Sequence, residues 1–547
     1  MRSIPALSLL SVCLSASLAA QALPPVPVPP ENPITPQKAV LGKLLFWEEQ
    51  LSSNNRVACG TCHTFAAGGG DLRRAVHPGN DGLSPSPDDT FGSPGVPRSD
   101  ANNDYVPDPR FGFQLQVTRR ASPSNFAAAW FPELFWDGRA GGQFVDPDTG
   151  VVAIAQGGAL ENQALAPLVA GDEMAHDGRT FAQAVAKLGT ARPMALATNL
   201  PPDMAAAVAG GASYADLFAA AFGTPEITAA RIAFAIATYQ RTLVPDQTPW
   251  DRFQAGIPGA MTPQQINGMN VFNGPGRCNL CHTPGLFSDR QFRNLGLRPV
   301  AQDPGRQAIT GNFADRGRFK VPSLRNVGLR TSFLHTGQFT TLNQVIGFYI
   351  GGGGPNLDNK DPLLQPLTAP PPNGVPPPAA NDLLVFVGTA LTDPRVAAGQ
   401  FPFDRPTLRS QLLGNLGALY GPGTAGSGGL VPQMRAGVPA NVGNIDFKVG
   451  IDGALGGAPA VFLIALQPAF AQFQGVNVNV ALGAELHVPG VLGGAAGVPG
   501  AGYGTLRVPL PDEPGLAGVS LFTQWWVWDG GAPNGAASSR GAELRFF

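Results

Sequence analysis

The sequence predicts a mainly α-helical protein, in which two related helical domains are followed by a C-terminal domain resembling a β-sandwich. Two observations support this fold class. The stretches TPQKAVLGKLLF from Thr35 and TPQQINGMNVF from Thr262 begin like helices, and each precedes a Cys-x-x-Cys-His motif. From about residue 407, short alternating runs such as VFLIALQ, VNVNVAL and GTLRVPL stand between glycine-rich turns, which is typical of antiparallel strands.

The N-terminal segment has the pattern of an export signal followed by a tether. A basic residue, an apolar run and Ala-Gln-Ala ending at Ala22 predict a secretory signal over residues 1–22. Cys13 lacks the small preceding residue of a lipoprotein signal. The stretch LPPVPVPPENP then predicts an extended, proline-rich tether over residues 23–34. We therefore expect a periplasmic or otherwise exported protein with no transmembrane segment.

The first helical domain is predicted over residues 35–245. Helical patterns occupy residues 214–222 and 227–243, the second with its start signal at Thr224. The stretch 64–118 is dense in glycine, proline and aspartate and is too long for an ordinary connection. Such a loop is usually either functional or disordered.

The second helical domain is predicted over residues 246–406, and Gln265 gives its first helix a capping box. The separation of the two similar stretches is far longer than a solenoid repeat, so we expect two related domains. A β-rich domain is predicted over residues 407–547. It is interpreted either as a binding or anchoring module or as a passive packing domain. Its terminal sequence WWVWDGGAPNGAASSRGAELRFF suggests a strand pair with exposed aromatic side chains.

The composition argues against nucleic acid as a partner. The chain has 36 Lys and Arg against 38 Asp and Glu in 547 residues, without a basic block. Of its five cysteines, one lies in the expected signal. The other four form two Cys-x-x-Cys pairs, and a histidine directly follows each pair.

Two segments have the spacing of c-type haem attachment: Cys59-Gly-Thr-Cys62-His63 and Cys278-Asn-Leu-Cys281-His282. In such a motif the two thiols add to the vinyl groups of haem, and the histidine reaches the iron from one face. A redox disulfide or half of a zinc site would also use Cys-x-x-Cys. Two complete motifs in an exported chain favour two covalently bound haem c groups, with His63 and His282 as iron ligands.

The motifs along residues 37–405 are similar to those of the bacterial di-haem cytochrome c peroxidases, the family that includes MauG. The shared landmarks are LGKLLFWEEQLSSNNRVACGTCH, FWDGRA, LENQALAPLVAGDEM, RTLVPDQTPWDRF, CNLCH and FKVPSLRNVGLRTSFLHTG. The resemblance implies two cytochrome-c-like domains packed together. It also implies that hydrogen peroxide reacts at the first haem and that the second haem transfers electrons. The implied partner is a small redox protein that donates electrons, or a protein substrate.

The resemblance assigns catalytic roles to several side chains. Trp136 matches the tryptophan between the two haems, and Glu173 matches the glutamate over the first haem. Gln163 and Pro167 match other residues lining that pocket. A carboxylate beside the iron can take a proton from one peroxide oxygen and deliver it to the other. The alternatives are that Glu173 is a solvated loop acid and that Trp136 is a core residue.

Tyr349 matches the position of the sixth ligand to the second haem, which is methionine in many members and tyrosine in MauG. No methionine occurs between Met269 and Met434. We therefore expect Tyr349 to bind the iron, with His335 as the fallback ligand; a packed helix residue is the alternative. An anionic phenolate lowers the reduction potential and a thioether raises it.

A tyrosine ligand thus favours an enzyme whose two haems share the oxidising equivalents and oxidise a partner or substrate at a distance, as in MauG. Two other functions remain open. One is peroxide removal with electrons from a small redox protein. The other is electron transfer by a non-catalytic di-haem carrier.

The resemblance leaves other positions less well matched. His77 lies in the region of a detachable histidine ligand of the first haem, but a surface histidine is the other interpretation. His176 and His487 match no motif. The residues at an interdomain calcium site of the family are replaced here by Ala121, Arg330 and Ser332, which weakens calcium binding.

Overall fold

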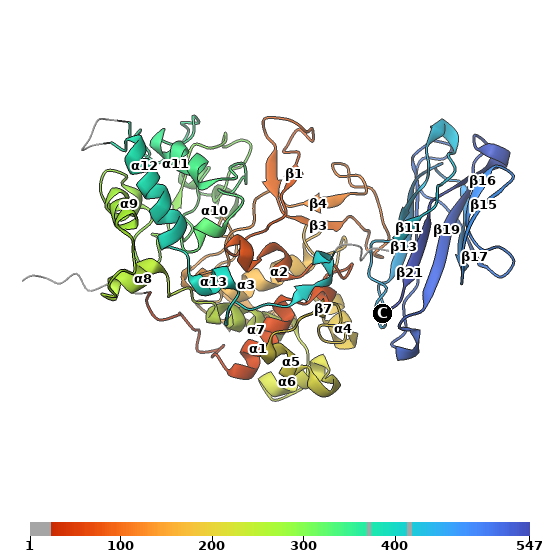
Figure 1. The fold of residues 1–547 in the computed structure, drawn as a ribbon, viewed down its shortest axis with the longest axis horizontal. Helices are drawn as coiled ribbons and strands as arrows, with labels where there is room; N and C mark the ends of the chain where they lie inside the picture. The colour runs from red at the N-terminus through yellow and green to blue at the C-terminus, as the bar shows by residue number, and fades with distance from the viewer. Residues whose placement is uncertain (1–22, 369–373, 413–417) are drawn as a thin grey trace, which may run out of the picture.

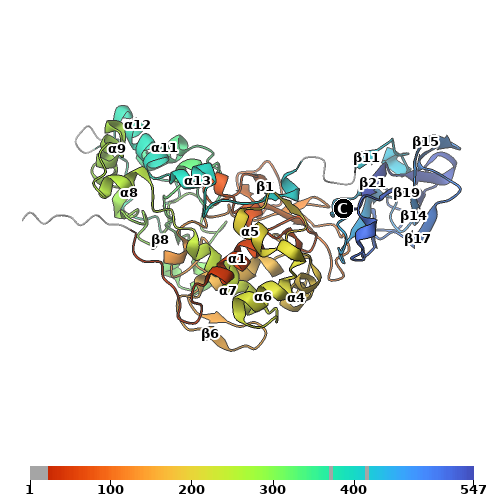
Figure 2. The same cartoon turned by 60° about the horizontal axis from the view of Figure 1, so that its bottom comes forward.

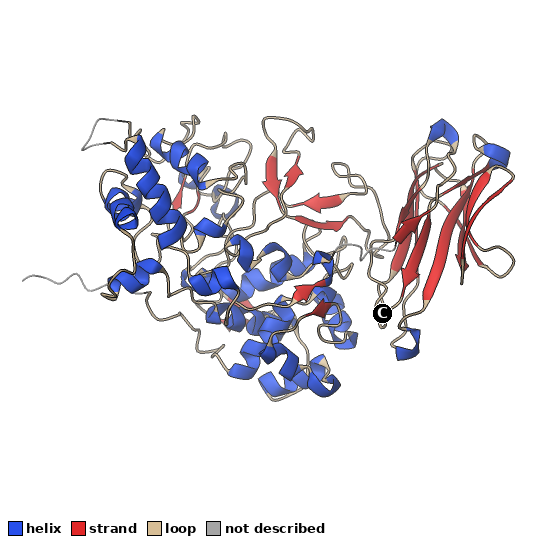
Figure 3. Cartoon of the chain, in the orientation of Figure 1, coloured by secondary structure: helices blue, strands red, loops and turns tan. Residues whose placement is uncertain are grey.

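The computed structural model describes residues 23–368, 374–412 and 418–547, so the expected signal over residues 1–22 lies outside the described residues. Helices prevail up to about residue 400, and strands follow (Figure 3). Short strand pairs also occur among the helices, and the C-terminal part is rich in strands. The expectation of a mainly α-helical chain is therefore not confirmed for the protein as a whole.

Thirteen α-helices are described: α1 (Pro36–Phe46), α2 (Cys59–Cys62), α3 (Ala159–Leu165), α4 (Phe181–Thr190), α5 (Pro202–Ala207), α6 (Tyr214–Phe222), α7 (Ala229–Thr242), α8 (Pro249–Gln254), α9 (Pro263–Asn273), α10 (Gln307–Thr310), α11 (Leu342–Ile350), α12 (Pro377–Val385) and α13 (Pro394–Ala398). Elements α1 to α7 form the first helical part, and α8 to α12 form the second. Figures 1 and 2 both show the first helical part between the second helical part and the strand-rich part. No single helix in the described ranges is long and apolar enough to cross a membrane; the two segments Pro202–Gly211 and Tyr214–Phe222 meet that test only together, bent by 119°.

The predicted starts of α1 and α9 are confirmed. The Thr35 hydroxyl accepts a hydrogen bond from the Lys38 amide at 3.3 Å. Thr262 and Gln265 form the predicted capping box, with bonds of 3.2 and 2.8 Å. The predicted start of α7 is wrong, because the capping hydroxyl belongs to Thr228 and the four residues before it are not helical.

The first helix of each helical part crosses a later helix at a glycine. A Cβ atom on Gly42 of α1 would lie 1.9 Å from the Ala235 carbonyl oxygen of α7. A Cβ atom on Gly268 of α9 would lie 2.0 Å from the Asp382 carbonyl oxygen of α12. Only a residue without a side chain permits these approaches. The sequence repeat therefore has a counterpart in the packing of each part.

Each helical part has its own buried core. After the residues of the second core, the chain again contributes side chains to the first core. Helices α1, α4, α6 and α7 supply the first core, while α9, α11 and α12 supply the second. Val396 and Phe403 are then buried in the first core, and β10 (Thr407–Leu408) pairs with β7 (Ala197–Thr198). The domain limits of 35–245 and 246–406 stay predictions.

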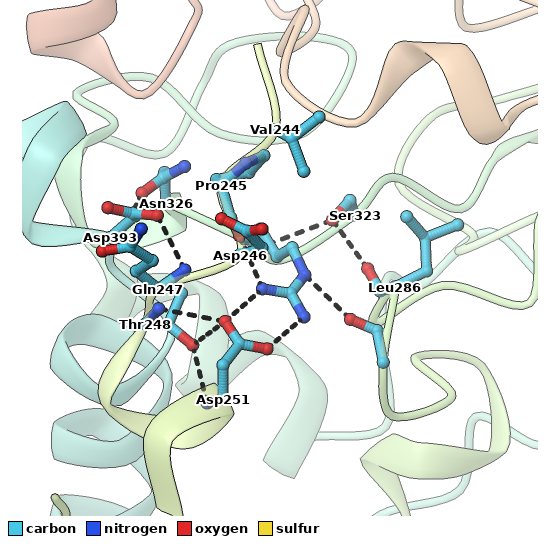
Figure 4. A network of polar contacts seen from close by, with 12 residues as sticks. Val244, Pro245, Asp246, Gln247, Thr248, Asp251, Leu286, Ser323, Asn326 and Asp393 are labelled. Atoms are coloured by element: carbon cyan, nitrogen blue, oxygen red, sulfur yellow. Dashed lines mark hydrogen bonds and ion pairs between the residues drawn. The ribbon is translucent and has the colours of Figure 1, made fainter. Parts of the chain in front are cut away.

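A buried arginine fixes the connection between the helical parts. Arg325 donates to the Pro245 carbonyl at 2.7 Å and to the Asp251 carboxylate at 2.8 Å. Asp251 also accepts from the hydroxyl of Thr248, the cap of α8, at 2.6 Å. Figure 4 shows these contacts converging where the chain leaves α7 and enters α8.

The long stretch 64–118 contains two antiparallel strand pairs. They are β1 (Ala75–His77) with β2 (Thr90–Gly92), and β3 (Pro94–Pro97) with β4 (Leu115–Val117). Figure 1 shows β3 and β4 on the side of the first helical part that faces the strand-rich part. Four further short strands in the helical parts are β5 (Phe144–Val145), β6 (Val152–Ile154), β8 (Phe292–Arg293) and β9 (Phe319–Lys320).

The strand-rich part comprises β11 (Ala418–Tyr420), β12 (Gln433–Arg435), β13 (Lys448–Ala454), β14 (Pro459–Ala465), β15 (Pro468–Phe473), β16 (Val476–Val480), β17 (Leu486–Val491), β18 (Gly502–Arg507), β19 (Ser520–Trp528), β20 (Ala536–Ser538) and β21 (Gly541–Arg545). One antiparallel sheet has the order β11-β21-β19-β14-β17, with β20 beside β19, and a second has the order β12-β13-β18. Their buried side chains share one core. The predicted terminal pair is β19 with β21; Trp525 points into this core, whereas Trp528 is 56% exposed.

Candidate di-haem site

The two Cys-x-x-Cys-His motifs adopt the same local geometry. The first forms α2, and the second begins with the short helix η6 (Cys278–Leu280). In each motif the histidine amide donates to the carbonyl of the first cysteine, at 3.0 Å for His63 and 2.8 Å for His282. This turn brings both thiols and the imidazole to one side of the chain. All four cysteines are free.

Each motif histidine is oriented by a backbone carbonyl. Nδ1 of His63 lies 3.1 Å from the Gly69 oxygen, and Nδ1 of His282 lies 2.9 Å from the Phe287 oxygen. A proton on Nδ1 satisfies each contact and leaves Nε2 as the atom able to bind a metal. Burial lowers the pKa of both imidazoles, which favours the neutral form that coordinates iron.

The first cavity adjoins the first motif and has a volume of about 290 Å³. Its lining includes Cys62, His63, Trp136, Gln163 and Glu173. The sequence predicted these residues to act together, and the fold brings them to one cavity from separate segments of the first helical part.

Glu173 is a carboxyl group of the first cavity whose pKa is clearly raised. Burial, with a smaller contribution from the neighbouring Asp172 carboxylate, raises the pKa of Glu173 to about 7, and Arg139 opposes this rise. A carboxyl group with this pKa can both take up and release a proton near neutral pH.

The second cavity has a volume of about 200 Å³ and adjoins the second motif. Its lining includes Cys278, Cys281, His282, His335 and Tyr349. Tyr349 reaches it from the last turn of α11. Burial, and then the two thiols, raise the pKa of Tyr349 above its ordinary value, so the phenol keeps its proton unless a cation replaces it.

Trp136 lines both cavities. Its indole Nε1 donates to the Ala121 carbonyl at 2.8 Å, and its own carbonyl accepts from the Lys320 amide at 2.8 Å. The Ala121 amide in turn donates to the His335 carbonyl, and the rings of Trp136 and His335 lie 6.2 Å apart. The indole is thus held rigidly between the two sites.

Two cationic side chains line the second cavity together with Trp136: Lys320, which no sequence pattern singled out, and Arg330, which the sequence brought up only for its effect on calcium. Lys320 lines both cavities; its ammonium makes one long hydrogen bond, 3.4 Å to the Glu133 carbonyl, and lies 4.5 Å from the centre of the Phe131 ring. Arg330 lines the second cavity, and its Nη1 has no hydrogen-bond partner among the described residues. Burial lowers the pKa of Lys320 to about 7 and that of Arg330 to about 10. Both belong to the FKVPSLRNVGLRTSFLHTG landmark, but sequence alone does not show their burial.

Arg330 also occupies the place considered for calcium. Its guanidinium donates to the Ser122 carbonyl at 2.8 Å and to the Ser332 carbonyl at 3.2 Å. The described residues contain no group of three or more His, Cys, Asp or Glu side chains placed to hold a metal ion. The zinc alternative for the cysteine pairs therefore has no ligand set in these ranges.

Four residues considered from the sequence lie outside both cavity linings. His77 ends β1, where its ring packs on Phe111 and its Nδ1 accepts from the Gly79 amide. Pro167 lies in the short 3₁₀ helix η4 (Ala166–Val169), which directly follows α3. Nδ1 of His176 contacts the Asp177 carbonyl, and the exposed His487 pairs with Glu485.

Comparisons with known proteins identify a family to which this chain is similar. A family model described as di-haem cytochrome c peroxidase matches residues 36–258. The methylamine utilization protein MauG of Methylorubrum extorquens is 32% identical over 336 residues, covering 60% of this chain and 72% of that protein. The cytochrome-c peroxidase IdrP1 of Denitromonas iodatirespirans is 29% identical over 432 residues, covering 72% and 93%. A crystal structure of a MauG-like protein associated with microbial copper homeostasis aligns with a TM-score of 0.50 and 25% identity, covering 70% of this chain and 96% of that one.

Proposed function

The chain belongs to the di-haem cytochrome c peroxidase family, and from this premise we propose that it is an exported di-haem peroxidase that oxidises a partner or substrate through Trp136 and a Tyr349-ligated second haem. In this proposal, Glu173 and Gln163 act on hydrogen peroxide at the first haem. The observation that carries this proposal is the position of Trp136, which lines the cavity of Glu173 and also that of Tyr349.

The residues present fit two haem c groups. Cys59 and Cys62 would hold the first covalently, and Cys278 and Cys281 the second. His63 and His282 would bind the irons through Nε2, since Nδ1 of each faces a carbonyl. The unpartnered Nη1 of Arg330 and the Lys320 ammonium are suited to the propionates. When bound, a haem with an open axial position supplies peroxide chemistry, and one with both positions filled supplies electron transfer.

At the first site the chain supplies a proton carrier. The Glu173 carboxylate takes a proton from one peroxide oxygen and returns it to the other, which makes a neutral leaving group. Its raised pKa suits both halves of this transfer. The Gln163 amide can orient peroxide through hydrogen bonds. These two side chains argue against a non-catalytic electron carrier, which has no use for a proton carrier at an open site.

At the second site the chain supplies an anionic ligand. Tyr349 would bind Fe(III) as the phenolate, and an anionic ligand of this kind would lower the reduction potential. A site of this kind accepts electrons poorly and holds an oxidising equivalent well. The buried Trp136 then serves as the relay between the two sites.

Peroxide removal with electrons from a small redox protein is the second candidate function. Its support is the surface near the second motif, where Leu280 and Leu363 are 48% and 44% exposed and Leu363 belongs to the cavity lining. Exposed apolar side chains beside a redox site suit transient docking. Fast turnover with a reduced small redox protein would favour this function.

Electron paramagnetic resonance of the resting ferric protein and of Tyr349→Phe tests the main proposal. We expect one high-spin and one low-spin haem, with only the low-spin signal changed by the substitution. Two low-spin haems and no reaction with peroxide would establish an electron carrier. A low-spin signal that is unchanged in Tyr349→Phe would indicate that His335, and not Tyr349, is the ligand of the second haem.

A further inference from the structure

The strand-rich part packs against the segments that hold Glu173, and we propose that Lys448 of β13 positions the Glu173 turn through two short hydrogen-bonded chains. Lys448 is thereby a positioning residue for the peroxide site, although it belongs to the part of the chain beyond the haem motifs. The inference rests on the proposed role of Glu173.

The Lys448 ammonium is fully engaged by the stretch 64–118. The residue is 1% exposed, and its Nζ donates to the Ser99 hydroxyl at 2.8 Å, to the Asn103 side-chain oxygen at 2.8 Å and to the Asn103 carbonyl. Three acceptors match the three protons of an ammonium group. The same Nζ lies 4.1 Å from the centre of the Tyr105 ring. One buried cation from the strand-rich part therefore organises a loop of the first helical part.

Ser99 and Asn103, which accept hydrogen bonds from Lys448, are both linked by further hydrogen bonds to the turn that contains Glu173. The Ser99 carbonyl accepts from the Asp177 amide at 2.8 Å. The Asn103 side-chain amide donates to the Ser53 carbonyl at 3.2 Å, and the Ser53 amide donates to the Met174 carbonyl at 2.8 Å. The two chains thus reach the backbone directly after Glu173 and a few residues further on.

Strands β3 and β4 lie directly against the same turn. A Cβ atom on Gly95 would be 2.2 Å from the Asp172 carbonyl oxygen and 2.6 Å from that of Glu173. The Gln116 side chain donates to the Gly171 carbonyl at 2.7 Å. At such close contact a displacement of this strand pair displaces the Glu173 backbone, because closely packed atoms leave no free space to absorb it.

A second group of contacts keeps the strand-rich part in register with this loop. The Tyr105 amide donates to the Thr505 hydroxyl at 2.8 Å, and the Tyr105 ring fills the space above Gly450, where a Cβ atom would lie 2.6 Å away. Lys187 of α4 pairs with Asp446 at 2.7 Å, just before β13. These contacts therefore hold β13 against the loop, so that Lys448 lies beside its hydrogen-bond acceptors.

The test compares Lys448→Met with Arg540→Met in the full-length, haem-loaded protein. The exposed Arg540 donates to the Leu419 and Gly421 carbonyls of its own part, so it is the control for loss of a cation that does not reach the loop. We expect faster hydrogen exchange at the amides of Ser53 and Asp177 in Lys448→Met, and kcat/KM for peroxide lower by about ten- to hundred-fold. The control should match the parent protein in both. Exchange and peroxide kinetics unchanged in a folded Lys448→Met protein would overturn the inference.

Asn103→Ala keeps the inference falsifiable if Lys448→Met unfolds the strand-rich part. It breaks one chain from the loop side, and exchange at Ser53 should rise while that within β13 and β14 stays unchanged. In the double variant, Lys448→Met with Asn103→Ala, the increase in activation free energy should be smaller than the sum of the increases in the two single variants. The reason is that both substitutions break the same hydrogen-bonded chain through Asn103. Additive effects would contradict the mechanism. Glu173→Gln separates the two proposals: unchanged peroxide kinetics there would reject the role of Glu173, while the exchange data still test the positioning.

Discussion

Arg325 and Asp251 form a two-point ion pair, with Nη1 to Oδ2 and Nη2 to Oδ1 both at 2.8 Å. The Arg325 side chain has no exposed surface, and its Nε donates to the Gly285 carbonyl at 2.8 Å, three residues beyond His282. This pair therefore links the start of the second helical part to the loop that follows the second haem motif.

Asp251→Asn should destabilise the protein by about 3–5 kcal/mol, because it leaves the buried Arg325 charge uncompensated. Urea or thermal unfolding followed by circular dichroism measures the loss. Asp246→Asn is the control: Asp246 is 53% exposed and pairs with Arg395, so its removal should cost at most about 1 kcal/mol. Equal effects of the two substitutions would contradict the structural role of the buried pair.

Glu173→Gln should slow the reaction with peroxide by about 10²–10⁴-fold, since the amide cannot carry the proton. In the parent protein kcat/KM should rise with pH through about 7, as the carboxyl group, whose pKa is raised by burial, becomes the basic form. Stopped-flow kinetics between pH 5 and 9 measure this. The variant should lose the dependence, and a parent profile flat across pH 7 would assign the proton transfer to another group.

Tyr349→Met should raise the reduction potential of the second haem, because a thioether favours Fe(II) more than a phenolate does. Axial ligands shift haem potentials over a range of about 0.8 V, so the change should be readily resolved by spectroelectrochemistry. The potential of the first haem should move far less. A second-haem potential equal in both proteins would mean that Tyr349 is a packed helix residue.

Trp136→Phe should slow oxidation of the partner or substrate by about ten-fold or more while peroxide still reacts at the first haem. Phenylalanine stays aromatic, although its ring is smaller; it is far harder to oxidise and loses the hydrogen bond to Ala121. Trp250→Phe is the control, since Trp250 is buried in the second core outside both cavities. Equal loss in both variants would indicate a packing effect.

Glu49 makes stability depend on pH. Burial raises its pKa from 4.5 to about 7, although the Arg409 and Ser410 amides donate to it. The folded state then binds the proton more tightly than the unfolded state, so stability falls as pH rises from about 4.5 to 7. Glu49→Gln should remove up to about 3 kcal/mol of that fall, measured by urea unfolding at pH 4.5 and 8. An identical pH dependence in both proteins would contradict the assignment.

Sequence patterns predicted the elements whose signals are local. The caps at Thr35 and Thr262 lie beside the helices that they start, and the alternating runs after residue 407 became β14, β16 and β18. The start of α7 was misplaced because Thr224 precedes a proline, a strong start signal, while the hydroxyl that caps the helix belongs to Thr228. Strands β1 to β4 were not predicted, since each has only three or four residues, and the glycines and prolines of β2 and β3 disfavour strands when judged locally.

The candidate site likewise combines residues that the sequence predicted with residues whose contacts only the structure shows. The haem motifs follow from spacing, and the resemblance to a family proposed Trp136, Glu173, Gln163 and Tyr349. The importance of Lys320, Arg330 and Lys448 depends on burial and on partners distant in the chain, which no local pattern contains. His77 was considered because of its place after the first motif, but its ring packs on Phe111 instead of lining a cavity.

The pairing of β10 with β7 imposes an order on biosynthesis. About 200 residues separate the two strands, and the whole second helical part lies between them. At a synthesis rate of about 5–20 residues per second, the ribosome finishes β10 roughly 10–40 s after β7. Throughout that interval the first core lacks Val396 and Phe403, so part of its apolar surface stays uncovered until residue 403 has emerged.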